Sequence, residues 1–447
     1  MPPTRSGIAD YAAELLEGVG RRHEIDVFVA TTQEQGAWAA TQGPFTVRSA
    51  HDFVWARVRT PYDLVVYQLG NARCHDYMWP YLFKWPGLVV LHDAQLHHAR
   101  GWSLLSRRRL DDYRAELAFN HPALPSAAAE IGLSGFSGPL YYFWPMLRTV
   151  VSSARAVAVH NARLAADVSA AFPGTPVRAV AMGVGDPLAS REAAEAVRRR
   201  HGLAPDAVVL SAVGAITPEK RLEPILRALA VVRRYQPDVR LLLVGQAMPH
   251  FDVMATAHAL GVGDLVTIPG YVETDELPAY LAASDVVLSL RWPSAHETSA
   301  SWLRAVAAGR PTVVTDLAQQ TDVPTLDPRS WTVVHSQPTL ARLDPVAVGI
   351  DILDEQHSLT LALKRLATDP ALRARIGTAA RAYCANGHTI DRMVSAYDGL
   401  LRESAAVPDP AVTLPSHLRP DPSAHGMHLL AAFDEATTRR ATLPSGD

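Results

Sequence analysis

The sequence is poor in lysine, in cysteine and in excess charge, and each shortage excludes a class of protein. Only three of its 42 basic residues are lysines, and the formal net charge at pH 7 is −3. A nearly neutral chain has no electrostatic footprint for nucleic acid, so we expect no nucleic-acid partner. Its two cysteines, Cys74 and Cys384, provide neither a disulfide framework nor a metal-ligand spacing. The many arginines and alanines are typical of a GC-rich, bacterial genome.

Long apolar runs are missing as well. No run approaches the roughly 18 residues that are needed to span a bilayer, and no secretory leader is recognised. We therefore expect a soluble cytoplasmic protein, for which a peripheral contact with the inner face of the membrane stays open.

The 447 residues, 48% of them hydrophobic, are enough for two globular cores. Apolar runs of strand length alternate with helical patterns, which predicts an α/β fold of two doubly wound parallel sheets. The expected strands lie at 25–30, 64–68, 88–91, 156–159, 177–181, 208–213, 240–244, near 266, 286–290 and 312–315. The predicted parts are a first domain over 1–190, a second over 205–385, a helix over 386–404 and a disordered tail over 405–447.

The segment 285–316 predicts a strand, a loop, a helix and a second strand. In such a βαβ unit the loop opens at the carboxyl edge of the sheet, where ligands bind. The loop holds Arg291 and Glu297, and Thr298 and Ser299 can cap the helix that follows. A helix start favours phosphate, so a cation, a carboxylate and an anion site converge there. A capped surface helix with an ordinary ion pair explains the pattern equally well.

Lys220 follows Gly214 in the turn after the strand at 208–213. An ammonium group in the first turn after such a strand can reach a phosphate. The alternative is a solvent-exposed lysine, which is less convincing in a chain that seldom uses lysine.

In the first domain, polar clusters at 68–71 and at His92 and Asp93 follow two expected strands and should face the ligand crevice. The histidine-rich run 92–98 has no recognised metal-ligand spacing, so no metal is expected. Arg107, Arg108 and Arg109 fall in one expected amphipathic helix over 103–117. They suit an anionic acceptor or a membrane surface, but a solvated helix face with neighbouring acidic residues is the favoured interpretation.

Several segments together resemble the glycosyltransferases of family 4, which have the GT-B fold of two facing Rossmann-like domains. The resemblance covers roughly residues 2–402 and rests on PPTRSGIADYAAELL, QLGN, PGLVVLHD, GAITPEKR, LLLVG, GYVETDELPAYLAASDVVLSLR, AAGRPTVVTD and GHTIDRMVSAYDGLL. Each segment is weak alone, whereas their order and spacing make the set specific. The last segment resembles the helix that crosses back onto the first domain.

The resemblance implies a retaining hexosyltransferase of class EC 2.4 that needs neither cofactor nor metal. The donor would be a UDP- or GDP-linked sugar on the second domain, and a glycan, lipid-linked or small-molecule acceptor would bind the first. Gly7 matches the glycine near the donor diphosphate, and His92 matches the histidine that contacts the transferred sugar. Lys220 matches the phosphate-binding lysine, and Glu297 falls in the window of the E-x7-E motif. Gly214, Arg291, Thr298 and Ser299 are expected to bind the donor with them.

Three positions depart from the family pattern. Ala215 stands where the family has an arginine, so one phosphate cation is missing unless Arg221 or Arg291 replaces it. The second motif glutamate is absent, because its place falls on Ala305 or Arg304 according to how the motif is counted. These losses leave a second hypothesis, a catalytically impaired GT-B domain that acts as the scaffold partner of another transferase. A nucleotide-sugar epimerase on the same fold is a third and less favoured alternative.

The third departure is that the strand expected before Ser6 is missing. A doubly wound sheet needs a strand ahead of its first glycine loop, and MPPTR with two prolines cannot supply one. We expect the codons upstream of Met1 to encode about four to six apolar, β-prone residues.

Overall fold

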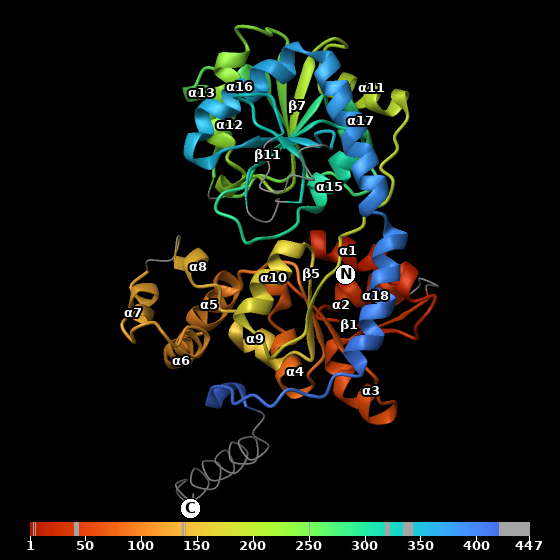
Figure 1. Ribbon diagram of the computed structural model, residues 1–447, viewed down its shortest axis with the longest axis vertical. Helices are drawn as coiled ribbons and strands as arrows, with labels where there is room; N and C mark the ends of the chain where they lie inside the picture. The colour runs from red at the N-terminus through yellow and green to blue at the C-terminus, as the bar shows by residue number, and fades with distance from the viewer. Residues whose placement is uncertain are drawn as a thin grey trace, which may run out of the picture.

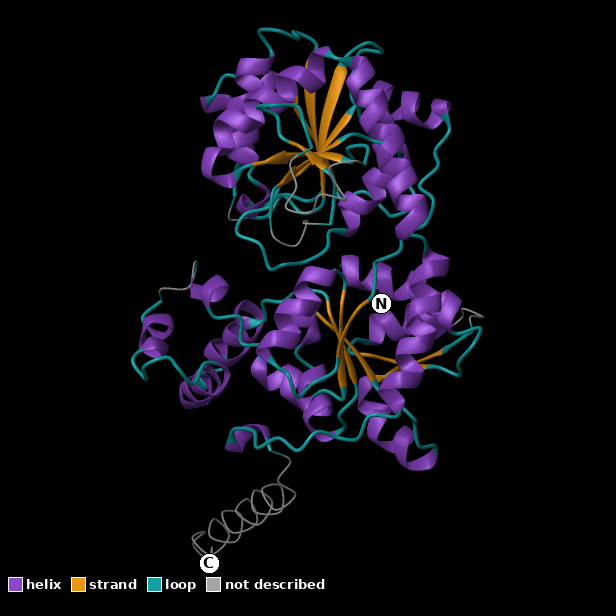
Figure 2. Ribbon diagram, in the orientation of Figure 1, coloured by secondary structure: helices purple, strands orange, loops and turns teal. Residues whose placement is uncertain are grey.

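The computed structural model describes residues 1–2, 4, 6–39, 44–135, 138, 140–249, 251–317, 322–333 and 343–419. Figures 1 and 2 show two α/β domains, one above the other, each with strands at its centre and helices around them. This agrees with the predicted pair of parallel sheets.

The strands of the first domain form two separate parallel sheets. One sheet joins β1 (Asp26–Val29) to β2 (Thr46–Ser49). The other has the order β3 (Val66–Leu69), β4 (Leu88–Leu91), β5 (Ala156–Val159) and β6 (Val177–Ala179). β4 and β5 are buried along their whole length, as their unbroken apolar sequences predict. The short β2, which alternates exposed and partly buried residues, was not predicted.

Ten α-helices are described in the first domain. They are α1 (Gly7–Val19), α2 (Thr32–Ala39), α3 (Phe53–Arg59), α4 (Met78–Lys84), α5 (His97–Ser106), α6 (Leu110–Asn120), α7 (Ala128–Leu133), α8 (Leu140–Phe143), α9 (Arg148–Ser153) and α10 (Ala162–Ala171). Helices α5 to α8 stand to one side of the domain (Figure 1).

The prediction of one helix over 103–117 is wrong. α5 ends at Ser106, Arg108 takes a left-handed conformation with φ of 57°, and α6 begins at Leu110. A left-handed residue cannot continue an α-helix, and hydrophobic periodicity gives no sign of it. Arg109 forms an ion pair with Asp112 at 2.6 Å, which agrees with the interpretation of these arginines as a solvated surface.

The second domain has a parallel sheet of seven described strands with the order β12-β13-β11-β10-β7-β8-β9. The bounds are β7 (Val208–Val213), β8 (Val239–Val244), β9 (Val266–Gly270), β10 (Val286–Ser289), β11 (Thr312–Thr315), β12 (Thr325–Leu326) and β13 (Ala347–Ile350). The α-helices described in this half of the chain are α11 (Arg191–Arg200), α12 (Leu222–Val232), α13 (Val253–Ala259), α14 (Leu277–Ala283), α15 (Ala300–Ala307), α16 (Glu355–Thr368), α17 (Pro370–Gly387) and α18 (Ile390–Ala405).

The linker between the predicted domains contains α11, which packs on the second domain. Val197 of α11 belongs to the apolar cluster of β7, β8 and α14, and Arg198 donates to Asp285 at 2.9 Å. The second core therefore takes in this helix, ahead of the predicted start at residue 205.

The prediction of a helix that crosses back onto the first domain is confirmed. α17 runs along the second domain, and α18 continues beside α1 (Figure 1). Tyr397 of α18 and Tyr11 of α1 share a buried hydrogen bond of 2.7 Å between their hydroxyls. Nearby, Oδ1 of Asp398 in α18 lies 2.8 Å from Nε2 of His23. The chain thus ties its two domains together by packing its last long helix on its first one.

The predicted disordered tail begins at residue 405, but the structure describes an ordered segment up to residue 419. Leu414 is buried, and Asp409 pairs with Arg155 at 2.7 Å. His417 lies 2.8 Å from Glu116, a fully buried carboxylate that Arg100 also binds. An extended strap needs only a few anchoring side chains, so the lack of apolar periodicity did not reveal it. Residues 420–447 lie outside the described part of the chain.

Truncation after Ala406 should lower the melting temperature relative to a protein that ends at Arg419. It exposes the site of Leu414, whose burial is worth about 1.5–3 kcal/mol. It also removes a contact to a charged group, worth about 1.5–3 kcal/mol. The expected decrease in differential scanning fluorimetry is several degrees, at about 2–4 °C per kcal/mol. Equal melting temperatures for the two truncated proteins would show that the strap does not stabilise the fold.

Candidate active site between the domains

The loop after β10 is held in place by its backbone. The amide of Arg291 donates to the Thr315 hydroxyl of β11 at 2.9 Å, and the amide of Trp292 donates to the carbonyl of Glu219 at 2.8 Å. Ser299 caps α15, because its hydroxyl accepts from the amide of Trp302 at 3.2 Å. The predicted βαβ unit, its loop and the capping role of Ser299 are therefore present as the pattern indicated.

Glu297 turns its carboxylate back into this loop. One oxygen accepts from the Ala295 amide at 2.8 Å and from the Ser294 hydroxyl at 3.1 Å. The other lies 2.6 Å from Nε of Arg291. The ion pair that the sequence left open does form. It joins the predicted cation and the predicted carboxylate directly in front of α15.

Lys220 reaches the same place from the neighbouring turn. Gly214, with φ of 100°, makes room for it, since a Cβ on Gly214 would lie 2.8 Å from Nζ. The ammonium group donates to the carbonyl of Val213. Burial and the positive charge of Arg291 lower the pKa of Lys220 to about 7, against the opposing charge of Glu297. Lys220 is therefore partly buried and bound to a backbone carbonyl, and the alternative of a solvent-exposed lysine does not hold.

His92, directly after β4, is held by contacts at both of its ring nitrogens. Nε2 lies 2.7 Å from Oε1 of Gln68, and Nδ1 lies 3.1 Å from Nε2 of His160. Burial lowers the pKa of His92 well below its usual value, and His160 adds to the effect. His160 in turn contacts the carbonyl of Val180 at 3.1 Å, which can only accept. Burial keeps His92 neutral, and these contacts hold its ring in place.

Asp93 follows His92 and faces the second domain. Its carboxylate accepts from the amide of Asn71 at 2.6 Å. Burial, together with the nearby negative charge of Glu297, raises its pKa to about 6, although the Asn71 amide and Arg291 oppose the increase. An acidic group on the first domain thus senses the charges of the loop on the second.

Backbone and side-chain contacts join the domains at this point. The amide of Ala94 donates to the carbonyl of Ala295 at 2.8 Å. The side-chain amide nitrogen of Asn161, Nδ2, donates to the hydroxyl of Thr298 at 3.5 Å. Beside them, Arg304 of α15 donates to Glu14 of α1 at 2.7 Å. The site is therefore built from the carboxyl edges of both sheets.

Gly7 lies at the start of α1, at this edge of the first domain. Ser6 caps the helix by accepting from the amide of Ile8 at 3.3 Å. A Cβ on Gly70 would meet both Ile8 and Asp93, so the first turn of α1 is adjacent to the cleft. A Cβ on Gly7 would meet no atom of the described chain within 4 Å. The space in front of this helix start is open to a ligand.

The structure decides which arginine can replace the one missing at Ala215. Arg221 binds both oxygens of Glu355, at 2.7 and 2.5 Å, and so is engaged elsewhere. Arg291 remains beside Lys220 in the site. The two candidate positions for the second motif glutamate hold an arginine and an alanine, so neither supplies a carboxylate. Arg304 pairs with Glu14, and Ala305 is fully buried.

Sequence reasoning missed two contributors. Asp93 was noted only as part of a polar strand end, and its charge environment depends on Glu297, which is far away in the sequence. Tyr142 of α8 gave no signal, yet burial and the negative charges of Glu219 and Glu297 raise its pKa. Tyr142 therefore lies near enough to the loop after β10 to respond to its charges.

Comparison with known proteins agrees with this architecture. Residues 207–331 match the family model described as "Glycosyl transferases group 1". A D-inositol 3-phosphate glycosyltransferase from Segniliparus rotundus is 36% identical over 148 residues, or 30% of this chain and 33% of that protein. A GDP-mannose-dependent alpha-(1-6)-phosphatidylinositol monomannoside mannosyltransferase from Mycolicibacterium smegmatis is 25% identical over 398 residues, or 85% of this chain and 90% of that protein.

Solved structures match at lower identity. HepE from Anabaena in complex with UDP has a TM-score of 0.61 at 15% identity and covers 89% of this chain and 96% of that one. WaaG, a glycosyltransferase involved in lipopolysaccharide biosynthesis, has a TM-score of 0.58 at 16% identity and covers 88% and 95%. The chain is a glycosyltransferase with the GT-B fold, which confirms the predicted fold and enzyme class. The assignment to family 4 stays a prediction.

The described residues also bear on membrane and metal partners. No helix among them is long and apolar enough to cross a membrane. No group of three or more histidine, cysteine and acidic residues among them is arranged to hold a metal ion. Independence from metal and cofactor stays a prediction.

The low pKa of Lys220 predicts a pH dependence of donor binding. Binding of a diphosphate needs the ammonium form, which the free protein loses as the pH rises above about 7. The Michaelis constant for a nucleotide sugar should therefore be flat below pH 7 and rise about tenfold per pH unit above it, as one proton is taken up. Lys220→Arg stays charged and should abolish the rise. A rise that persists in Lys220→Arg would assign the titration to another group.

Proposed function

We propose that this protein transfers a sugar from a nucleotide-diphosphate sugar to an acceptor with retention of anomeric configuration. The observation that carries the proposal is the meeting of Lys220, Arg291 and the capped start of α15 at the carboxyl edge of the second sheet. Two cations and a helix N-terminus form a site for an anion, and a diphosphate is the anion that a departing nucleotide presents.

Stabilisation of the leaving group follows from this arrangement. Negative charge develops on the diphosphate as the bond to the sugar breaks, and cations that are already in place stabilise it without reorganisation. Removal of one such stabiliser costs about 2.7–4 kcal/mol in barrier. Thr298 and Ser299 at the start of α15, with Gly7 across the cleft, would line the path of the phosphates.

The transferred sugar would lie between the domains. Glu297 holds the loop through Arg291 and Ala295 and places negative charge near the reacting carbon, which favours an oxocarbenium-like sugar. His92, held neutral by its burial, would contact the sugar from the first domain. Contacts between the two domains exclude water, which would otherwise hydrolyse the donor.

The nucleotide and the acceptor are proposed only as classes. The Mycolicibacterium relative is named for GDP-mannose and the Anabaena structure contains UDP, so the donor would be GDP- or UDP-linked. The named relatives act on inositol-based acceptors, which agrees with a glycan, lipid-linked or small-molecule acceptor on the first domain. A lipid-linked acceptor would bring the protein to the inner face of the membrane.

The absent motif glutamate and the alanine at 215 favour one alternative, an impaired transferase that serves as a scaffold partner. Such a protein would bind nucleotide weakly or not at all. Arg291 beside Lys220 weighs against it, since the cation lost at Ala215 is replaced within the site.

A panel of UDP, GDP, ADP and their sugars tests the proposal. One nucleotide family at 100 times its dissociation constant should stabilise the protein by about 2.7 kcal/mol. Incubation of that nucleotide sugar with candidate acceptors should then give a product whose anomeric signals in NMR match those of the donor. Lys220→Met is the matched control, because it keeps an apolar stem of similar length and should lose the shift. No stabilisation by any nucleotide would favour the scaffold alternative, and an inverted product would contradict the retaining mechanism.

A further inference from the structure

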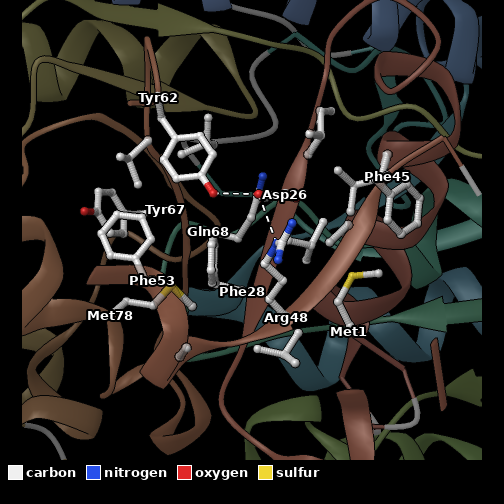
Figure 3. Close-up of a pocket in the computed structure, with 18 of the residues that line it drawn as sticks. Met1, Asp26, Phe28, Phe45, Arg48, Phe53, Tyr62, Tyr67, Gln68 and Met78 are labelled. Atoms are coloured by element: carbon white, nitrogen blue, oxygen red, sulfur yellow. Dashed lines mark hydrogen bonds and ion pairs between the residues drawn. The ribbon is translucent and has the colours of Figure 1, made fainter. Parts of the chain in front are cut away.

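A short series of side chains links His92 to the helix that crosses back onto the first domain. Oε1 of Gln68, on β3, lies 2.7 Å from Nε2 of His92. The same carboxamide interacts with the hydroxyl of Tyr397 on α18. Gln68 and Tyr397 both line a cavity of about 1160 Å³, and Figure 3 shows Gln68 on its wall. One side chain of the sheet therefore connects a residue next to the cleft with the crossing helix.

The other end of the series is a backbone carbonyl. Nδ1 of His92 lies 3.1 Å from Nε2 of His160, and Nδ1 of His160 lies 3.1 Å from the oxygen of Val180. Both rings are buried, and burial lowers the pKa of each, to about 4 for His160. At neutral pH each ring is therefore uncharged and has one proton.

The positions of these two protons follow from the carbonyl. The oxygen of Val180 can only accept, so the proton of His160 lies on Nδ1. Nε2 of His160 then accepts, which places the proton of His92 on its own Nδ1, between the two rings. Nε2 of His92 has no proton left and needs a donor.

Gln68 can supply that donor. The oxygen and the NH₂ group of a carboxamide have nearly the same shape, and the hydrogen bonds around them decide which of the two faces a given partner. With Oε1 toward His92, two acceptors would face each other, because Nε2 has no proton. A half-turn of the carboxamide brings the NH₂ group to Nε2, so that each contact from Gln68 to Val180 has one donor and one acceptor. Oε1 then lies on the side of Tyr397, whose hydroxyl can donate to it.

Tyr11 of α1 completes the series. Its hydroxyl lies 2.7 Å from that of Tyr397, and either one can donate. When Tyr397 donates to Gln68, Tyr11 donates to Tyr397, and neither hydroxyl is left without a partner. The rings of Tyr11 and His92 also stand nearly at right angles, with their centroids 4.8 Å apart and their planes at 80°. His92 is thus held at both nitrogens and along its ring.

We propose that Gln68 is a positioning residue for His92: its NH₂ group donates to Nε2 of His92, and the hydroxyl of Tyr397 holds it in that orientation. His92 then keeps one tautomer, with its proton on Nδ1, and both of its ring nitrogens are used inside the first domain. Since α18 follows α17 of the second domain, this setting depends on the docking of the crossing helix. The effect on turnover rests on the proposed function, in which His92 contacts the transferred sugar.

The position of the proton on His92 tests the orientation of Gln68 directly. ¹⁵N NMR of the full chain labelled at histidine should show, at pH 7, a protonated Nδ1 and an unprotonated Nε2 for His92. The signals of His92 are the ones that disappear in His92→Gln. A proton on Nε2 would place the oxygen of Gln68 against His92 and overturn the proposal, as would a ring with both nitrogens protonated.

A matched pair of variants tests the part played by Tyr397. Tyr397→Phe and Tyr11→Phe each keep the ring and remove the bond between the two hydroxyls, but only Tyr397→Phe also takes the donor away from Gln68. Tyr397→Phe should shift the Nε2 signal of His92 and lower kcat at least about tenfold, because the group that contacts the sugar is no longer held in place. The Michaelis constant should change little, since the proposed phosphate site lies on the second domain. Tyr11→Phe should leave the signal and kcat near their native values.

The donors for these assays are UDP-glucose and GDP-mannose. Equal losses of kcat in the two tyrosine variants, with equal shifts of the Nε2 signal, would assign the effect to the packing of α18 on α1 and overturn the positioning role. If the native protein uses neither donor, the proposed function fails, and the ¹⁵N signals alone decide on Gln68. A shift confined to Tyr397→Phe would then support the proposal, and an unshifted Nε2 signal in that variant would contradict it.

Discussion

The backbone hydrogen bond from Ala94 to Ala295 is the contact on which the site depends. It holds the strand ends of the first domain against the loop that follows β10 in the second. Neither domain has the site alone, because Asp93 and His92 come from one and Lys220, Arg291 and Glu297 come from the other. The crossing of α18 onto α1 supports this contact from the far side, with Tyr11 and Tyr397 sealed between the helices.

Each cation at the site has a partner within the protein. Arg291 is paired with Glu297, and Lys220 is bound to a backbone carbonyl with its pKa lowered to about 7. These groups are buried or half-buried, so each needs its partner. Under the proposed function, an incoming diphosphate would supply negative charge to both cations in place of these partners. Arg291 would then stand in for the arginine that is absent at Ala215.

The sequence predicted those parts of the fold that a local pattern encodes. Mostly apolar runs of strand length marked β4, β5, β7 and β11, and the caps around Ser299 marked α15. It did not predict β2, whose four residues lack an apolar run, or the left-handed Arg108, which divides one expected helix into two. The strap that ends at His417 was missed because it docks through a few separate side chains. The environment of Asp93 depends on a residue of the other domain, and no local pattern contains that information.

The pKa of Asp93 tests most directly whether the two domains form one site. A pH titration of its carboxyl carbon by ¹³C NMR should give a value near 6 in the native protein. Glu297→Gln removes a negative charge that raises this pKa and leaves Arg291, which lowers it, so the value should fall. Arg329→Gln should leave it unchanged, because Arg329 is an exposed residue of the second domain that pairs with Asp327 at 3.1 Å. A pKa of Asp93 that does not respond to Glu297→Gln would show that the strand ends of the first domain and the loop of the second do not meet in solution.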